Sequence, residues 1–327
     1  MTTLSATAPP EPACLHSLHG ETMGTSWCVK LVASARADLH ALHAGIQTQL
    51  DRVVAQMSTW ETTSDISRFN RAPAQSWHAL PADFFTVLSC AMEIARDSDG
   101  AYDPTIGPLV AAWGFGAAQG KQEIPTIETR TDARARVGWR QLVLRSETRL
   151  AYQVGNIALD LSAIAKGYGV DLVVSHLRAR GVVAALVEVG GELLGYGCKP
   201  DGSAWQVLVE ASPDADADCE PCVIVLDGDA VATSGDRWHA FEQAGMSYSH
   251  TLDPHSGIPV ERAAAAVTVI ADEAMRADAW ATAMTVLGAE AGLVLAQARN
   301  LAVRFVTRGE LGPLVHMSDQ FRARIAA

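Results

Sequence analysis

The chain has 327 residues, of which 49% are hydrophobic and 19% charged, a composition typical of a globular protein rather than a disordered or fibrous one. Its 25 basic and 37 acidic residues give a formal net charge of -12, which argues against general binding to nucleic acid or anionic lipid. An anionic substrate must therefore be held by a local site, through backbone N–H groups, a few basic side chains or a metal ion.

The six cysteines show no spacing typical of a disulfide framework, and we expect free thiols. They are Cys14, Cys28, Cys90, Cys198, Cys219 and Cys222. The last two form a single CxxC inside an acidic run, with no second pair or histidine cluster that would complete a zinc site. We interpret this CxxC as part of an exposed loop.

The first 19 residues contain three prolines and lack the continuous apolar stretch of a signal peptide. We expect residues 1–19 to form a poorly ordered extension and residues 20–327 to form the folded domain. No segment approaches the ~18 apolar residues of a membrane span. The chain as written is therefore expected to be cytoplasmic, or periplasmic if an export signal has been removed.

The first part of the chain predicts a strand pair followed by helices. Two strands are expected within His16–Ser34, bending at Met23-Gly24-Thr25, and the apolar spacing predicts a helix over Ala37–Met57. A helical turn is expected after Ser64, and a second long helix over Ala82–Arg96.

The next segment predicts one more helix start and a strand pair. Pro108 is well placed in the first turn of a helix. Gly116–Asp132 is expected to be an exposed connection, and Gln141–Val154 a hairpin of two strands.

The stretch Leu159–Asp171 predicts a helix with an unusual start. Apolar residues continue at helical spacing to Gly181, which suits the left-handed residue that ends a helix, and Ser162 is expected to cap the start. Gly167 and Gly169 lie in the first turns, where each costs about 1 kcal/mol relative to alanine. We therefore expect a flat ring or a phosphate to approach this backbone closely.

Asp160 and Lys166 lie on either side of this helix start, where unpaired N–H groups and the helix dipole favour an anion. That arrangement is typical of a nucleotide site. The alternative is a surface helix with Asp160 as its cap and Lys166 in solvent.

Hairpins dominate the segment after this helix. A buried strand is predicted over Ala184–Val189, and it ends at Gly190-Gly191, a pair that suits either a phosphate contact or a tight turn. Strands are expected over Trp205–Glu210 and Cys222–Leu226, the second forming a hairpin with Ala230–Thr233. Hairpins mixed with helices favour an α+β fold with mixed, largely antiparallel sheets and packed helices.

His250 and Asp253 form a candidate proton-transfer pair, because a histidine that titrates near neutral pH beside a carboxylate is typical of such pairs. The alternative is that Asp253-Pro254-His255-Ser256-Gly257 is only a turn.

Asp278 and Thr282 share one face of an alanine-rich helix, since they are four residues apart. A buried carboxylate and hydroxyl need partners. A hard cation such as Mg²⁺, which takes oxygen ligands, would satisfy both. An intrahelical hydrogen bond or an ion pair with Arg276 would serve equally well.

Eight short motifs follow one another in the order seen in the ApbE family, and over residues 20–307 the chain closely resembles those FAD:protein FMN transferases. The motifs are Met23-Gly-Thr25, Met57-Ser-Thr-Trp60, Tyr102-Asp-Pro-Thr-Ile-Gly-Pro-Leu109 with Trp113-Gly-Phe-Gly116, Asp160-Leu with Ala165-Lys-Gly167, Gly190-Gly191, Thr233-Ser-Gly235, Ser249-His250 with Asp253-Pro254, and Ala277-Asp278 with Thr282.

The resemblance implies an ApbE-like fold and a Mg²⁺-dependent transfer of FMN from FAD to a threonine hydroxyl of an acceptor protein, with release of AMP. It implies that FAD is lined by Met23, Trp60, Ala101, Tyr102, Asp103, Asp160 and Lys166. It also implies that the metal is held by the Ala163 carbonyl with Asp278 and Thr282. From their chemistry, we expect His250 with Asp253 to help deprotonate the incoming threonine, with either residue as the base.

Two departures from the family pattern concern this site. Trp60 stands where many relatives have tyrosine, which preserves stacking but alters the polar contact, and Ala163 stands where some have threonine. Two other functions stay open: a FAD pyrophosphatase that gives FMN and AMP, and a noncatalytic flavin-binding maturation factor. The expected partner carries a Ser/Thr-Gly-Ala-Thr-type motif, which this chain itself lacks.

Overall fold

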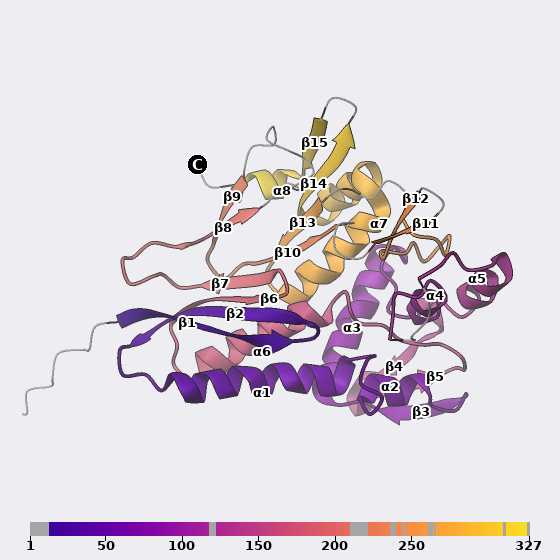
Figure 1. The fold of residues 1–327 in the computed structure, drawn as a ribbon, viewed down its shortest axis with the longest axis horizontal. Helices are drawn as coiled ribbons and strands as arrows, with labels where there is room; N and C mark the ends of the chain where they lie inside the picture. Colours follow the sequence, from indigo (N-terminus) through magenta and orange to yellow (C-terminus); the bar gives the residue numbers. More distant parts are fainter. Residues whose placement is uncertain are drawn as a thin grey trace, which may run out of the picture.

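The computed structural model describes residues 13–117, 122–209, 222–235, 240–243, 246–260, 264, 266–309 and 312–325. Cys219 and residues 1–12 of the expected extension therefore lie outside the described residues. Figure 1 shows a large sheet with long helices packed against it and a smaller group of elements at one side.

An eight-stranded antiparallel sheet has the order β1-β2-β6-β7-β10-β13-β14-β15. Its strands are β1 (Ala13–Thr22), β2 (Thr25–Ser34), β6 (Ala184–Val189), β7 (Glu192–Tyr196), β10 (Ala230–Ser234), β13 (Ala266–Ala271), β14 (Ala302–Gly309) and β15 (Gly312–Met317). The expected start of the domain at residue 20 differs from the structure, because Ala13 already pairs with Ser34.

Three smaller sheets complete the strands. They are β3 (Ser76–Ala79), β5 (Leu150–Gln153) and β4 (Val143–Arg145), in that order, the pair β8 (Trp205–Val209) and β9 (Cys222–Leu226), and the pair β11 (Ala240–Gln243) and β12 (Met246–Ser249). The β4–β5 hairpin confirms the prediction for 141–154. The predicted hairpin of β9 with β10 is wrong. The Gly228 N–H donates to the Gly195 carbonyl, and the Gly195 N–H donates to the Asp229 carbonyl, so the connecting turn is bound to β7 and β10 pairs within the large sheet.

The helices are α1 (Leu39–Met57), α2 (Asp65–Asn70), α3 (Ala82–Asp97), α4 (Gly107–Ala112), α5 (Ile127–Arg134), α6 (Ala165–Ala179), α7 (Ala274–Arg299) and α8 (Asp319–Arg322). Two short 3₁₀ turns lie at 139–141 and 146–148. The connection expected over 116–132 contains the start of α5, whose N-cap is the Thr126 side chain. Mixed helices and antiparallel sheets confirm the α+β class.

Alternate residues of the strands divide the core between the two faces of the large sheet, as the two-residue period of a strand requires. Val29 and Leu31 pack with α1 and α6 on one face, and Val32 packs with β8, β9 and α8 on the other. Helix α6 therefore lies between α1 and the sheet and presents its first turn to α7 (Figure 1).

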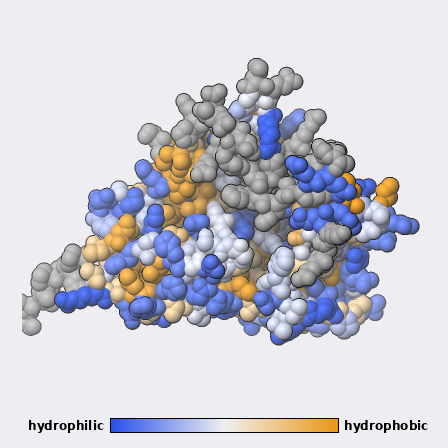
Figure 2. Space-filling model, viewed as in Figure 1, coloured by the Kyte–Doolittle hydropathy of each residue, from blue (hydrophilic) through white to orange (hydrophobic). Residues whose placement is uncertain are grey.

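Within the described residues, α7 is the one helix long and apolar enough to cross a membrane by length and composition. Its contacts with α3, α6 and five strands place it in the core instead. The helix breaks at Gly288, where φ is 71°, and then continues to Arg299. Figure 2 shows mostly hydrophilic residues on the face in view, with smaller apolar patches between them.

Candidate active site at the junction of two helices

The segments around Pro104 and Asp160 run side by side, although 55 residues lie between these two positions in the sequence. The Asp160 N–H donates to the Pro104 carbonyl at 2.9 Å, and Ile106 forms a parallel bridge with Ala158. The Asn70 side chain fixes Leu159 through both its N–H, at 2.7 Å, and its carbonyl, at 2.9 Å. These bonds bring the two predicted flavin-site segments together.

The turn that leads into α6 is closed by Asp160 rather than by Ser162. The Asp160 carboxylate accepts the Ser162 N–H at 2.8 Å, and the helix itself begins at Ala165 with no side-chain cap. The predicted Ser162 cap is therefore wrong, because the chain forms a separate turn before the helix. Ala163 lies in this turn and is partly exposed.

Gly167 is the contact point between α6 and α7. A Cβ at this position would lie 2.2 Å from the Ala274 carbonyl oxygen, so only glycine allows the two backbones to approach. The Gly167 N–H donates to Asp278 Oδ2 at 3.1 Å. We expected a ring or phosphate against this backbone; the group that approaches it is the first turn of α7.

Gly169 makes room for side chains of the same core. A Cβ there would lie 3.2 Å from both the Met23 Cε and the Leu50 Cδ2 atoms. Met23 itself has a left-handed backbone, with φ of 48°, in the turn between β1 and β2. This turn conformation directs the predicted flavin-site methionine onto α6.

Asp278 is buried, with 3% of its surface exposed, and the first turn of α6 covers it. Burial raises the pKa of its carboxyl, while Lys166 and the Gly167 N–H act in the opposite direction. Thr282 is partly exposed one turn later, with its hydroxyl 3.4 Å from the Ser234 hydroxyl. Arg276 forms ion pairs with Glu93 and Glu273, so the alternative of an ion pair between Arg276 and Asp278 is wrong.

Lys166 forms an ion pair with Glu192, at the start of β7. The alternative of a solvated lysine is therefore wrong, since its side chain is 31% exposed and the partner carboxylate only 4%. Burial lowers the pKa of Lys166, but the carboxylates of Asp278 and Glu192 outweigh this effect and raise it. Burial and the charge of Asp278 raise the pKa of Glu192 to about 8, against the effect of Lys166.

Ala101, Tyr102 and Asp103 are all buried. The Asp103 carboxylate accepts the Thr105 N–H at 2.8 Å, the Thr105 hydroxyl at 2.6 Å and the Trp139 N–H at 3.0 Å. The Asp103 carboxylate therefore holds two loops together, and only the acceptor capacity that remains after these three bonds is available to a ligand. Burial raises the pKa of its carboxyl, and the hydrogen bonds from Thr105 counteract it.

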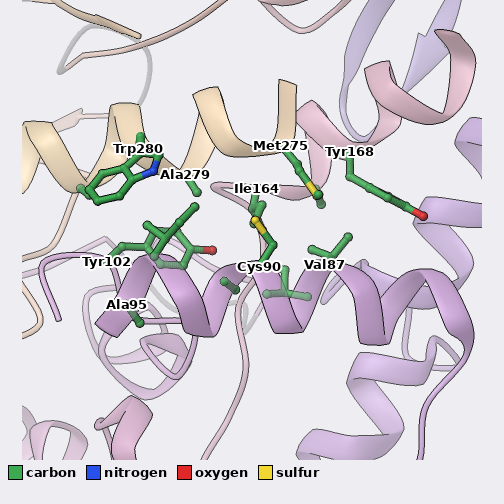
Figure 3. Packing of buried hydrophobic residues seen from close by; sticks show 14 of the residues in the cluster. Val87, Cys90, Ala95, Tyr102, Ile164, Tyr168, Met275, Ala279 and Trp280 are labelled. Carbon is green, nitrogen blue, oxygen red and sulfur yellow. The ribbon is translucent and has the colours of Figure 1, made fainter. Parts of the chain in front are cut away.

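The Tyr102 ring lies between α3 and α7 in Figure 3, with Trp280 above it and Cys90 and Ile164 nearby. Its hydroxyl is buried and has no hydrogen-bond partner among the residues that the structure describes. Burial and then the charge of Asp278 raise the pKa of this phenol. A buried hydroxyl of this kind is available to a bound ligand or water.

Trp60 is 65% exposed and follows the C-terminal end of α1, where its N–H donates to the Ser58 hydroxyl at 3.2 Å. A large apolar side chain at this exposure is free to stack on a flat ring.

Asp253 organises a turn. Its carboxylate accepts the N–H groups of His255, at 2.8 Å, and Ser256, at 3.2 Å, and lies 3.4 Å from His255 Nδ1. The Asp253 carbonyl accepts the Gly257 N–H at 2.8 Å. These contacts match the alternative of a turn, and they leave His250, which is partly exposed, as the stronger candidate base.

A metal site at this junction would be built from mixed oxygen donors. No group of three or more His, Cys, Asp or Glu side chains suited to a metal occurs in the described part of the chain. Ala163, Asp278 and Thr282 offer a carbonyl, a carboxylate and a hydroxyl, which together fit a hard cation such as Mg²⁺ but not zinc. Among the residues that the structure describes, the Asp278 carboxylate accepts one hydrogen bond, from the Gly167 N–H, which leaves it capacity as a ligand.

Sequence reasoning missed Glu192 as a member of this charge cluster. Its signal was a carboxylate directly after two glycines and before the apolar run Leu193-Leu194. A charged residue at the start of a buried strand is rarely left without a partner. That pattern indicates a partner, but only the fold identifies it as Lys166.

Comparison with known proteins defines the class. The ApbE family model matches residues 23–305. A FAD:protein FMN transferase from Vibrio cholerae is 35% identical over 313 residues, which are 95% of this chain and 93% of that protein. The protein of the same name from Escherichia coli strain K12 is 32% identical over 322 residues, 96% of this chain and 92% of that one.

Solved structures agree with these relatives. The flavinyl transferase ApbE of Pseudomonas stutzeri superposes with a TM-score of 0.88 at 38% identity, over 96% of this chain and 98% of that one. The flavin transferase ApbE of Vibrio cholerae gives a TM-score of 0.88 at 34% identity, over 96% and 100%. The chain therefore belongs to the ApbE family, and it is an enzyme of the transferase class.

Proposed function

We propose that this protein transfers FMN from FAD to a threonine hydroxyl of an acceptor protein, in a Mg²⁺-dependent reaction that releases AMP. The observation that carries the proposal is the contact of the α6 start with α7, where the Gly167 N–H meets the Asp278 carboxylate beside Lys166. The family relationship supports the transfer of FMN from FAD.

The proposed reaction forms one phosphoester bond and breaks one phosphoanhydride bond. The threonine oxygen attacks the phosphorus of the FMN half of FAD, its proton passes to a base, and AMP leaves with the electrons of the broken P–O bond. Such transfers depend on the placement of the nucleophile and on neutralisation of the phosphoryl oxygens.

Ala163, Asp278 and Thr282 would hold the metal, whose charge would neutralise the diphosphate. Lys166 would donate to phosphate oxygens from the first turn of α6. The remaining proposed flavin contacts are Met23, Trp60, Ala101, Tyr102, Asp103 and Asp160. Of these, Trp60 has the exposure that stacking requires, whereas Asp103 acts chiefly by bracing its loop.

His250 is proposed as the base that takes the threonine proton. An imidazole titrates near neutral pH and can accept this proton at modest cost. Asp253 shapes the turn that follows, since its carboxylate is already bound to two backbone N–H groups.

Intact-mass spectrometry separates this proposal from the two other functions. The protein is incubated with FAD, Mg²⁺ and an acceptor domain that carries Thr-Gly-Ala-Thr, with a Thr→Ala acceptor as control. Transfer adds the mass of an FMN phosphoester to the first acceptor only. Free FMN and AMP without an adduct would identify a pyrophosphatase, and unchanged FAD would identify a noncatalytic flavin-binding protein; either result overturns the proposal.

A further inference from the structure

Glu192 is a buried carboxylate that has no role in the reaction proposed above. The residue is 3% exposed, one of its oxygens contacts Lys166 Nζ, and its Oε2 atom is buried without a hydrogen-bond partner among the described residues. Burying an ion pair costs desolvation that its attraction does not reliably offset. Stability is therefore a poor reason for this pair, and a role in the site is a better one.

The turn before Glu192 is shaped around the lysine. Val189 pairs with Glu192 across the two-residue turn Gly190-Gly191, whose φ values are 59° and 98°. A Cβ on Gly190 would lie 2.8 Å from Thr25 Cγ2 and 3.3 Å from Lys166 Cδ. The glycine pair thus forms a tight turn, and its first residue leaves room for the lysine chain to reach the carboxylate.

Three elements contribute charge to one buried cluster: Lys166 from α6, Glu192 from β7 and Asp278 from α7. The charge of Asp278 acts on both other groups. The cluster thus brings two carboxyl groups to one ammonium. A cation at Asp278 would balance the charge of that carboxylate and leave the lysine paired with Glu192.

We propose that Glu192 is a positioning residue that fixes the Lys166 ammonium at the first turn of α6 for the diphosphate of FAD. The inference rests on the proposed function and deepens it. An ammonium has three donors, so one bond to Glu192 leaves two for phosphate oxygens. Fixing a flexible lysine before the substrate arrives also removes part of the ordering cost of binding.

The test measures FAD affinity by flavin fluorescence, without an acceptor, so that binding is read separately from transfer. Glu192→Gln keeps the shape and replaces the carboxyl group that contacts Lys166 with an amide, and it is expected to weaken FAD binding by about 10-fold. Glu188→Gln, a partly buried position in the preceding strand β6, is the matched control and is expected to bind as the wild type does.

The double variant E192Q/K166M distinguishes positioning from a general structural effect. If Glu192 acts through Lys166, removal of the lysine in the E192Q background should weaken FAD binding by no more than about 3-fold further. Thermal unfolding of each variant verifies its fold, and the double variant contains no unpaired buried charge from this pair.

Two results would overturn the inference: a folded E192Q protein with wild-type FAD affinity, or a double variant that binds FAD at least ~10-fold more weakly than E192Q. The second result would mean that Lys166 binds FAD without help from Glu192. Failure of the wild-type protein to bind FAD would instead contradict the proposed function and, with it, this inference.

Discussion

His250 and Asp253 looked like one catalytic pair in the sequence, and the structure gives Asp253 a different task. Its carboxylate is committed to the N–H groups of His255 and Ser256. Short spacing in a sequence does not determine where two side chains point, because a turn can direct them to different groups.

We expect His250→Ala to reduce the rate of FMN transfer by about 100-fold or more while leaving FAD affinity unchanged, since a lost base slows chemistry rather than binding. Asp253→Asn should remain within about 3-fold of the wild-type rate, because asparagine can hold the same turn. Single-turnover transfer at saturating FAD measures both variants. An active His250→Ala protein together with an inactive Asp253→Asn protein would reverse the assignment.

Single site residues were predictable where the neighbouring sequence already marks them, and not where their role depends on a distant partner. Asp278 is a carboxylate on an alanine-rich helix and Lys166 is a cation at a helix start, so the sequence indicated both as site residues. Glu192 was missed because its role depends on a lysine 26 residues away. In the sequence, Gly190-Gly191 suited a phosphate loop and a tight turn equally. The pairing of Val189 with Glu192 shows that the two glycines form a tight turn.

At the scale of elements, most helices and strands followed from apolar spacing, including β6 over Ala184–Val189 with the predicted bounds. The errors arose where neighbouring strands join different sheets. Leu226 is the last residue of β9, which pairs with β8, whereas Ala230 is the first residue of β10, which pairs with β7. A turn sequence predicts a reversal of the chain, but pairing with distant strands determines which sheet receives the next strand.

The glycines of α6 provide a direct test of how this helix meets α7. Gly167→Ala would place a Cβ 2.2 Å from the Ala274 carbonyl oxygen, and the backbone would have to shift. We expect a loss of about 3 kcal/mol or more in the free energy of unfolding. Gly169→Ala, two residues on, meets only flexible side-chain ends at 3.2 Å and should stay within about 1 kcal/mol of the wild type.

Chemical denaturation of the two alanine variants measures this difference. Equal stabilities would mean that the backbones of α6 and α7 do not meet at Gly167. Because the Gly167 N–H also contacts Asp278, the same substitution should lower FMN transfer in whatever protein remains folded.

At the scale of the whole molecule, a buried carboxylate links stability to pH. Asp171 on α6 accepts the N–H groups of Ala274 and Met275 at 2.8 and 3.0 Å, and so caps the start of α7. Burial raises the pKa of Asp171 from 3.8 to about 7, although both N–H bonds act against it. The native state therefore keeps this proton to a higher pH than the unfolded chain does.

The free energy of unfolding should consequently fall as the pH rises between 3.8 and about 7, by at most about 4 kcal/mol from this group. Asp171→Asn removes this group's contribution and should make the slope shallower across this range, while Glu192, whose pKa burial also raises, keeps part of the slope. Asp319→Asn, at a side chain that is 73% exposed on α8, is the control and should keep the wild-type slope. Thermal unfolding from pH 5 to pH 8 makes the comparison, and identical slopes in all three proteins would contradict this linkage.

The most direct test of the central claim, that α6 and α7 together form a divalent-cation site for the FAD diphosphate, is the Mg²⁺ dependence of FMN transfer in the wild type and in Asp278→Asn. Asparagine retains the size of Asp278 but removes the charge of the buried ligand. The account predicts a wild-type rate that rises to saturation with Mg²⁺ and a variant, folded by its unfolding temperature, that is about 100-fold slower or more at every concentration. A folded Asp278→Asn protein with the wild-type rate and the wild-type Mg²⁺ dependence would contradict it.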